Sequence, residues 1–358
     1  MSNIIKYNNL LAFHPGSYVE DVMKDLNITQ KEFAERLGIH SKVLCELING
    51  EANLSPEVAL KLEKLTGVDY QSWMNLQNAY DRKRLEIDKK MEEDEKQIAT
   101  LIDLTYFKDL GIAENKRHTM AEKITVLRNC LNVSNLCYLS NFNPAVSYRN
   151  VSGFEEKNVI NSNVMLEIAS NVARNESENK LNRKKLEDSL PLIKEMLNES
   201  EKTFYPKLKE ILLSCGVILV GLPNLKNSNL QGATKKFKDG SVLLLITDRN
   251  KFADIFWFSL MHEIAHILSS DFYTDKEDKE AYDAKELRAD KWAAEFFIPE
   301  NNYTGFININ DFSEQSIVNF AKENNIPVWI LIGRLKKDGY LNYNEFKKYN
   351  LKYKIVAA

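Results

Sequence analysis

Residues 29–38 read Thr-Gln-Lys-Glu-Phe-Ala-Glu-Arg-Leu-Gly, a pattern that predicts one complete short helix. Thr29 and Glu32 have the spacing of a capping box, in which each side chain accepts a hydrogen bond from the backbone of the other residue. Three apolar residues between Glu32 and Gly38 recur at helical spacing, so they predict one buried face: Phe33, Ala34 and Leu37. Gly38 then provides the flexible residue at which the chain turns.

Further short helices are predicted on both sides of this stretch. Ser17 is expected to cap a preceding helix, because it follows a His-Pro-Gly turn. Ser41 is expected to cap a third helix that runs to Ile48. Ser55 precedes a proline and predicts the start of a fourth helix. We therefore expect residues 1–76 to form a compact helical domain.

Residues 77–140 are predicted to be a helical linker. Its first part, up to about residue 97, is strongly charged, with apolar residues spread through it. This composition is typical of a solvated spacer helix, and pairing with a second subunit is the alternative. The region is also where we would expect a proteolytic cut.

Residues 141–358 are predicted to form a third domain of mixed α and β structure. Two apolar runs, 217–220 and 242–246, are bounded by turn-forming residues and predict strands, and Gln231-Gly232-Ala233 predicts a further edge strand. A helix is expected over 251–270 and another over about 284–297. The fold class is therefore α+β, mostly helical.

The composition excludes several classes of protein. The 358 residues are 44% hydrophobic and carry a net charge of −3, which excludes a protein that is basic throughout. No apolar run is long enough to cross a bilayer, and the N-terminus lacks the pattern of a signal peptide. We therefore expect a cytoplasmic protein.

His262-Glu263-Ile264-Ala265-His266 is the motif with the clearest chemistry. The two histidines are four residues apart, so on a helix both imidazoles project from one face and can hold one zinc ion. Glu263 follows the first ligand, where a carboxylate can serve as general base. The other histidines, His14, His40 and His118, are isolated, and cap or surface roles are expected for them.

A third ligand is expected from the downstream helix, because catalytic zinc usually takes three protein ligands. Glu286 and Asp290 share one face of that helix. We predict Glu286 as the metal ligand, and Asp290 as an acceptor that orients a ligand histidine. The alternative is that both carboxylates face solvent. Zinc fits a ligand set of imidazoles and a carboxylate, and manganese or iron can occupy similar sets.

These motifs resemble the ImmA/IrrE family of metallopeptidases. The resemblance rests on His262-Glu263-x-x-His266 and on the segment from Glu286 to Pro299, and it extends over about residues 140–340. It implies a zincin-like domain with a small sheet, and it implies Glu286 as a ligand. Arg288 and Asp290 stand where the family usually has Glu and Asn. Members cleave helix-turn-helix repressors, so the resemblance implies such a protein as substrate.

The first 80 residues are similar to the HigA class of antitoxins, within the lambda-repressor-like (XRE-type) helix-turn-helix group. The similarity rests on residues 14–16, 29–38 and 47–50, and on Trp73 before Asn75. It implies binding to a DNA operator, usually as a homodimer that reads two half-sites. It also suggests a toxin as partner.

The predicted third helix would then enter the major groove of DNA. The residues expected to contact DNA are Gln30, Lys31, Ser41, Lys42, Cys45 and Glu46. Gln30, Lys31 and Lys42 would contact phosphates, whereas Val43 is expected to pack inward. Glu46 would repel phosphate, so weak DNA binding or a protein-binding role for this module is the alternative.

Together these features predict a cytoplasmic transcription regulator with zinc endopeptidase activity. Its expected substrate is a repressor or antitoxin, or its own linker. The alternative is a repressor without proteolytic activity, in which the metallopeptidase domain acts as a sensor or binding scaffold.

Overall fold

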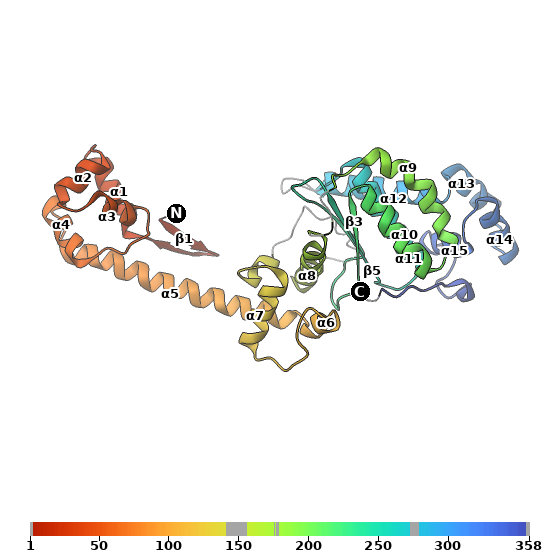
Figure 1. Cartoon of the computed structure of the whole chain (residues 1–358), viewed down its shortest axis with the longest axis horizontal. Coiled ribbons are helices and arrows are strands. Elements are labelled where there is room, and N and C mark those ends of the chain that lie inside the picture. The colour runs from red at the N-terminus through yellow and green to blue at the C-terminus, as the bar shows by residue number, and fades with distance from the viewer. Residues whose placement is uncertain (1–2, 141–155, 175, 177–178, 273–278, 356–358) are drawn as a thin grey trace. The chain divides into compact units, whose positions relative to one another are not determined.

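The computed structural model describes residues 3–140, 156–174, 176, 179–272 and 279–355. The chain divides into two compact units, Met1–Gln97 and Ile98–Ala358. Each unit is mostly helical and contains one small sheet (Figure 1). The mostly helical α+β fold is thus confirmed. Among the described residues, no helix combines the length and the apolar character needed to span a membrane.

Four short helices build the N-terminal core. They are α1 (Pro15–Asp25), α2 (Gln30–Leu37), α3 (Ser41–Ile48) and α4 (Pro56–Thr66). Fully buried side chains from all four, such as Val19, Phe33, Leu44 and Leu62, pack into one cluster. Thr29 caps α2, and Gly38 ends it in the left-handed conformation, as predicted.

Two helix starts differ from the prediction. Ser17 and Ser41 lie inside α1 and α3, and the caps are His14 and His40. His14 Nδ1 accepts a hydrogen bond from the backbone of Gly16 at 3.0 Å, and His40 Nδ1 accepts one from Lys42 at 3.2 Å. A neutral imidazole nitrogen can therefore serve the capping role that was predicted for serine. The cap role expected for these two histidines is confirmed.

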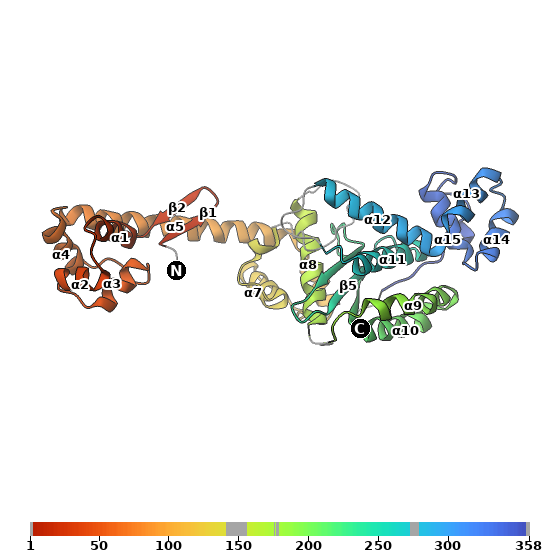
Figure 2. The same ribbon diagram turned by 90° about the horizontal axis from the view of Figure 1, so that it is seen from above.

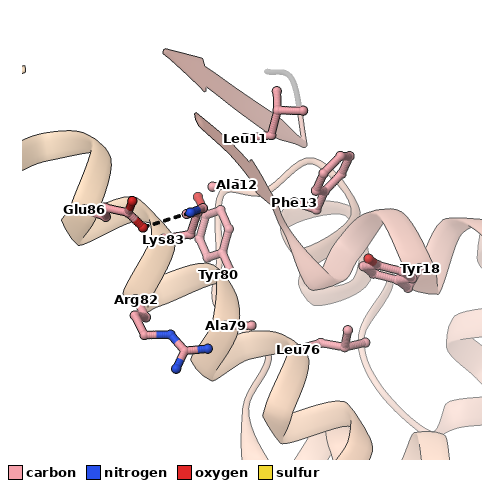
Figure 3. Close-up of a pocket in the computed structure, with 10 residues that line it drawn as sticks. All are labelled: Leu11, Ala12, Phe13, Tyr18, Leu76, Ala79, Tyr80, Arg82, Lys83 and Glu86. Atoms are coloured by element: carbon pink, nitrogen blue, oxygen red, sulfur yellow. Dashed lines mark hydrogen bonds and ion pairs between the residues drawn. The ribbon is translucent and has the colours of Figure 1, made fainter. Parts of the chain in front are cut away.

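A hairpin precedes the helices and was not predicted. β1 (Ile4–Tyr7) pairs antiparallel with β2 (Leu10–Phe13), and both lie against α5 (Tyr70–Leu101). β2, α1 and α5 surround an open groove of about 290 Å³ (Figure 3). Several of its apolar side chains are more than 40% exposed, namely Leu11, Phe13 and Tyr18.

Gly16 lies where α1 comes close to the backbone of α3, and it supports a stability prediction. A Cβ atom at this position would lie 1.9 Å from the backbone oxygen of Leu47. Because backbone cannot move aside cheaply, we expect Gly16→Ala to destabilise the N-terminal unit by about 3 kcal/mol or more. Hydrogen exchange of α1 and α3 measures this effect. Gly305→Ala is the control, because its Cβ meets open space.

The predicted linker, 77–140, is divided between the two units. Its charged first part belongs to α5, whereas residues from Ile98 onward belong to the second unit. There the end of α5, α6 (Leu104–Asp109) and α7 (Met120–Leu131) bury apolar side chains such as Phe107 and Leu127. Residues 98–140 therefore belong to the second unit rather than to a separate linker, because their apolar side chains share one cluster with side chains from residues 160–173 and 218–245. The predicted boundary at residue 141 lies outside the described residues.

A three-stranded sheet is the centre of the second unit. β5 (Val242–Thr247) lies between β3 (Val217–Leu222), which is parallel to it, and β4 (Gly232–Lys236), which is antiparallel. Alternate side chains of the strands enter two different hydrophobic clusters, so both faces are buried. All three predicted strands are present.

Helices cover both faces of this sheet (Figures 1 and 2). α8 (Glu156–Ala173) lies on one face, and α10 (Glu201–Ser214) and α11 (Ala253–Ser269) lie on the other. The remaining helices are α9 (Arg183–Glu195), α12 (Lys279–Phe297), α13 (Glu300–Ile309), α14 (Glu314–Glu323) and α15 (Val328–Lys337). α11 packs against β4, α12 and α15, and these contacts determine the surroundings of its two histidines.

Candidate functional site

The helix α11 places both histidines of the motif in the interior. The apolar residues Trp257, Leu260, Ile264 and Ile267 are fully buried around them. The side chains of His262, Glu263 and His266 are at most 1% exposed. Buried polar groups need partners to offset the loss of water. The groups that contact these three buried side chains therefore indicate the chemistry of the site.

The helix α12 brings Glu286 to the two imidazoles. The Nε2 atoms of His262 and His266 lie 3.0 Å apart. Nε2 of His262 lies 3.3 Å from Oε2 of Glu286, and Nε2 of His266 lies 3.3 Å from Oε1. In a tetrahedral zinc site, bonds of 2.0–2.2 Å place the ligand atoms about 3.3 Å apart. The donor set and these spacings are therefore compatible with a site in which the three residues would hold one zinc ion.

Asp290 lies one helical turn beyond Glu286 and contacts the opposite side of the His262 ring. Its Oδ1 is 2.8 Å from Nδ1 of His262, so an Nδ1–H donated to the carboxylate leaves Nε2 as the lone pair that faces the site. Burial alone lowers the pKa of His262. Hydrogen bonds to Asp290 and Glu286 and the charge of Glu263 outweigh it and raise the pKa to about 9.

This raised pKa predicts that zinc binding depends on pH. In the metal-free protein, His262 carries a proton below about pH 9, and a metal ion must displace it. The affinity for zinc should therefore rise with pH, by about tenfold per unit between pH 6.5 and 8.5 if one proton is released. Competition with a chelating dye measures it. An affinity that is constant over this range would contradict the assignment of His262 as a ligand.

Glu263 lies against the strand β4. A Cβ atom at Gly232 would stand only 2.8 Å from Cγ of Glu263 and 2.9 Å from its Oε1. Only glycine lets the strand approach this side chain so closely. β4 pairs with β5 alone among the described strands, and its residues beside Glu263, Gly232 to Thr234, are buried. The general-base candidate thus lies beside an edge strand.

Two further residues near this cluster were not predicted. Burial, with the nearby charges of Glu286 and Glu263, raises the pKa of Tyr282 well above its usual value. Tyr282 is four residues before Glu286 on α12, so helical spacing could have identified it. Lys337 contacts Asp290 across 47 residues of sequence, and no local pattern indicated it.

The predicted DNA-contacting residues lie at the surface of the N-terminal unit. On α3, Ser41, Lys42 and Cys45 are exposed and Glu46 is half-buried, while on α2 Lys31 is exposed and Gln30 half-buried. Lys42 and Glu46 form an exposed ion pair at 3.7 Å.

The inward orientation predicted for Val43 is wrong. Its side chain is 42% exposed, because Leu44 and Leu47 already occupy the buried face of this two-turn helix. Val43 therefore adds an apolar group to the exposed face of α3. Such a group can contact the methyl group of thymine.

Comparison with known proteins identifies the N-terminal unit. The helix-turn-helix family model matches residues 19–73. The uncharacterised HTH-type transcriptional regulator YddM of Escherichia coli is 38% identical over 66 residues, which are 18% of this chain and 70% of that protein. Antitoxin HigA-1 of Vibrio cholerae is 36% identical over 61 residues, 17% of this chain and 57% of that protein. These similarities support the helix-turn-helix, HigA-like assignment.

A solved structure is similar over the same region. It is an addiction module antidote protein of a HigA family from Coxiella burnetii, with 29% identity and a TM-score of 0.21. The alignment covers 23% of this chain and 92% of that one.

Proposed function

The chain belongs to the helix-turn-helix family of DNA-binding regulators through residues 19–73, and we propose that it combines DNA binding with zinc-dependent cleavage of a protein. One observation carries the proposed enzyme activity. His262, His266 and Glu286 offer ligand atoms that all lie within 4.8 Å of one another, beside the buried carboxylate of Glu263. The proposal makes the second unit a zincin-like peptidase of the ImmA/IrrE type.

The residues around the site have distinct roles in this proposal. His262, His266 and Glu286 would hold the ion, which supplies Lewis acidity toward water and the scissile carbonyl when bound. Glu263 accepts a proton from the attacking water and then donates it to the nitrogen of the leaving amine. The buried surroundings of Glu263 exclude other water and strengthen its electrostatic interactions.

The edge strand β4 supports a peptide as the substrate. An extended segment can add to the edge strand of a sheet through main-chain hydrogen bonds, and a segment that added to β4 would lie beside Glu263. The charged segment 77–97 is a less suitable substrate, because it is continuous helix with Tyr80 and Ile87 buried. We therefore propose cleavage of another protein, a helix-turn-helix repressor or antitoxin.

Incubation of the purified, zinc-loaded protein with a repressor or antitoxin encoded beside it tests this activity. We expect defined fragments by mass spectrometry, and we expect a chelator to prevent them. A repressor that binds to the zinc-loaded protein and still stays uncut is the opposite outcome. That result would favour the alternative in which the second unit is a binding scaffold without proteolytic activity.

The DNA-binding role makes its own prediction. If Lys31 and Lys42 contact phosphates, each change to alanine should weaken binding to any duplex and reduce the salt slope of log K by about 1. Glu46→Gln should strengthen binding, because it removes a carboxylate from the exposed side of α3. Fluorescence anisotropy over a salt series measures both effects. Lys24→Ala, on α1, is the control. An equal change in the salt slope of this variant would contradict the assignment of Lys31 and Lys42 to the DNA interface.

We also propose that the chain binds its operator as a homodimer, since two-fold symmetric half-sites are the usual target of this module. The exposed side chains of Leu11, Phe13 and Tyr18 support a second copy as the occupant of the groove beside β2. Sedimentation of native protein and of Phe13→Ser tests this proposal. An unchanged dimer in the variant would exclude the groove as the dimer interface.

A toxin partner is the second candidate function. It is favoured by the similarity of the first unit to Antitoxin HigA-1. Co-purification with the product of an adjacent toxin gene tests it.

A further inference from the structure

Lys337 lies at the end of α15 and contacts two residues that surround His262. Its Nζ is 3.3 Å from Oδ2 of Asp290, on α12, and 4.2 Å from the centre of the Phe258 ring, on α11. Phe258 and His262 are four residues apart, so they lie on one face of α11. The ammonium group of Lys337, on α15, therefore contacts both α11 and α12 next to His262.

The two oxygens of Asp290 are divided between these partners. Oδ1 lies 2.8 Å from Nδ1 of His262, while Oδ2 faces Lys337. The exposed fraction of the side chain falls from 50% at Lys337 to 35% at Asp290 and 1% at His262. Lys337, Asp290 and His262 therefore form a chain of contacts that leads from the surface to the buried candidate metal site.

We propose that Lys337 is a positioning residue that fixes Asp290 and, through it, the tautomer and orientation of His262. This inference rests on the proposed metal site. A carboxylate with one oxygen bound can rotate about its χ2 bond, whereas an ion pair to the second oxygen restricts that rotation. The face of Phe258 holds the ammonium group in turn.

The inference predicts a change in metal affinity without loss of the fold. Outer partners of ligand histidines typically change metal affinity by about 10- to 100-fold. Because Lys337 acts one step further out, we expect Lys337→Met to weaken zinc binding by about tenfold. Lys337→Arg keeps the charge and should stay within about threefold of the native affinity.

A double-mutant cycle with Asp290→Asn separates this role from a general structural one. If Lys337 acts through Asp290, Lys337→Met should have no further effect on zinc affinity in the Asp290→Asn background. Zinc affinity is measured by competition with a chelating dye, and thermal melting reports the stability of each variant. The matched control is Lys291→Met, next to Asp290 on the same helix, because Lys291 is 70% exposed and pairs with Glu295 instead.

Four results would overturn the inference, and they are distinguishable. If native protein binds zinc and Lys337→Met binds it equally well, Lys337 has no positioning role while the proposed function stands. If the effects of Lys337→Met and Asp290→Asn add, or if Lys291→Met weakens zinc as much, Lys337 does not act through Asp290. If native protein binds no zinc, the proposed function and this inference both fail.

Discussion

Glu263→Gln should abolish most of the proteolytic activity while leaving zinc bound. Glutamine has nearly the same volume and fits the same buried position, but its amide cannot take a proton from water at neutral pH. Proton transfer by a positioned side chain contributes about 10²- to 10⁴-fold to a rate, so we expect a loss of that size. Quantifying fragments of the repressor substrate over time, at equal zinc occupancy, measures it.

The zinc content of Glu263→Gln is the control for this experiment. A variant that binds one zinc per chain and cleaves as fast as native protein would exclude Glu263 as the general base. A contaminating protease would produce the same fragments in preparations of native protein and of Glu263→Gln. Identical fragment patterns would therefore also count against the proposed activity.

Gly232→Ala should lower activity by about 100-fold with little change in zinc binding. The added Cβ would lie 2.8 Å from Cγ of Glu263, so the carboxylate must move. Displacement of a catalytic group by about 1 Å can reduce a rate by about 10²-fold. Steady-state cleavage of the repressor, together with zinc titration, measures both effects.

Lys236→Ala, at the exposed end of the same strand, is the matched control. We expect it to cleave at nearly the native rate. Equal losses in Gly232→Ala and Lys236→Ala would show that the strand, rather than the Glu263 position, is sensitive to change.

Local sequence patterns predicted most helices and strands, because their signals lie within a few residues. The capping threonine at residue 29 and the left-handed Gly38 are examples. The hairpin of β1 and β2 was missed because each strand has only four residues and depends on α5 for its burial. The packing of residues 98–140 was missed for a similar reason. Its core includes side chains from β3 and β5, more than 70 residues away.

The candidate site shows the same distinction between local and distant information. The spacing of His262 and His266 fixes their common face, so a helix is enough to bring them together. The approach of Glu286 depends on the packing of α12 on α11, which no local spacing determines. Glu286 was predicted from the helix face that it shares with Asp290 and from the resemblance to a known family. Lys337 comes from a helix with no motif, and only the folded chain places it next to Asp290.

The central claim is that two imidazoles and one carboxylate hold a single divalent ion. Elemental analysis of native protein and of His262→Ala, each exposed to zinc and then dialysed, tests it most directly. We predict about one zinc per chain in native protein and almost none in the variant. Zinc that stays stoichiometric in His262→Ala, or native protein that retains none, would contradict the account.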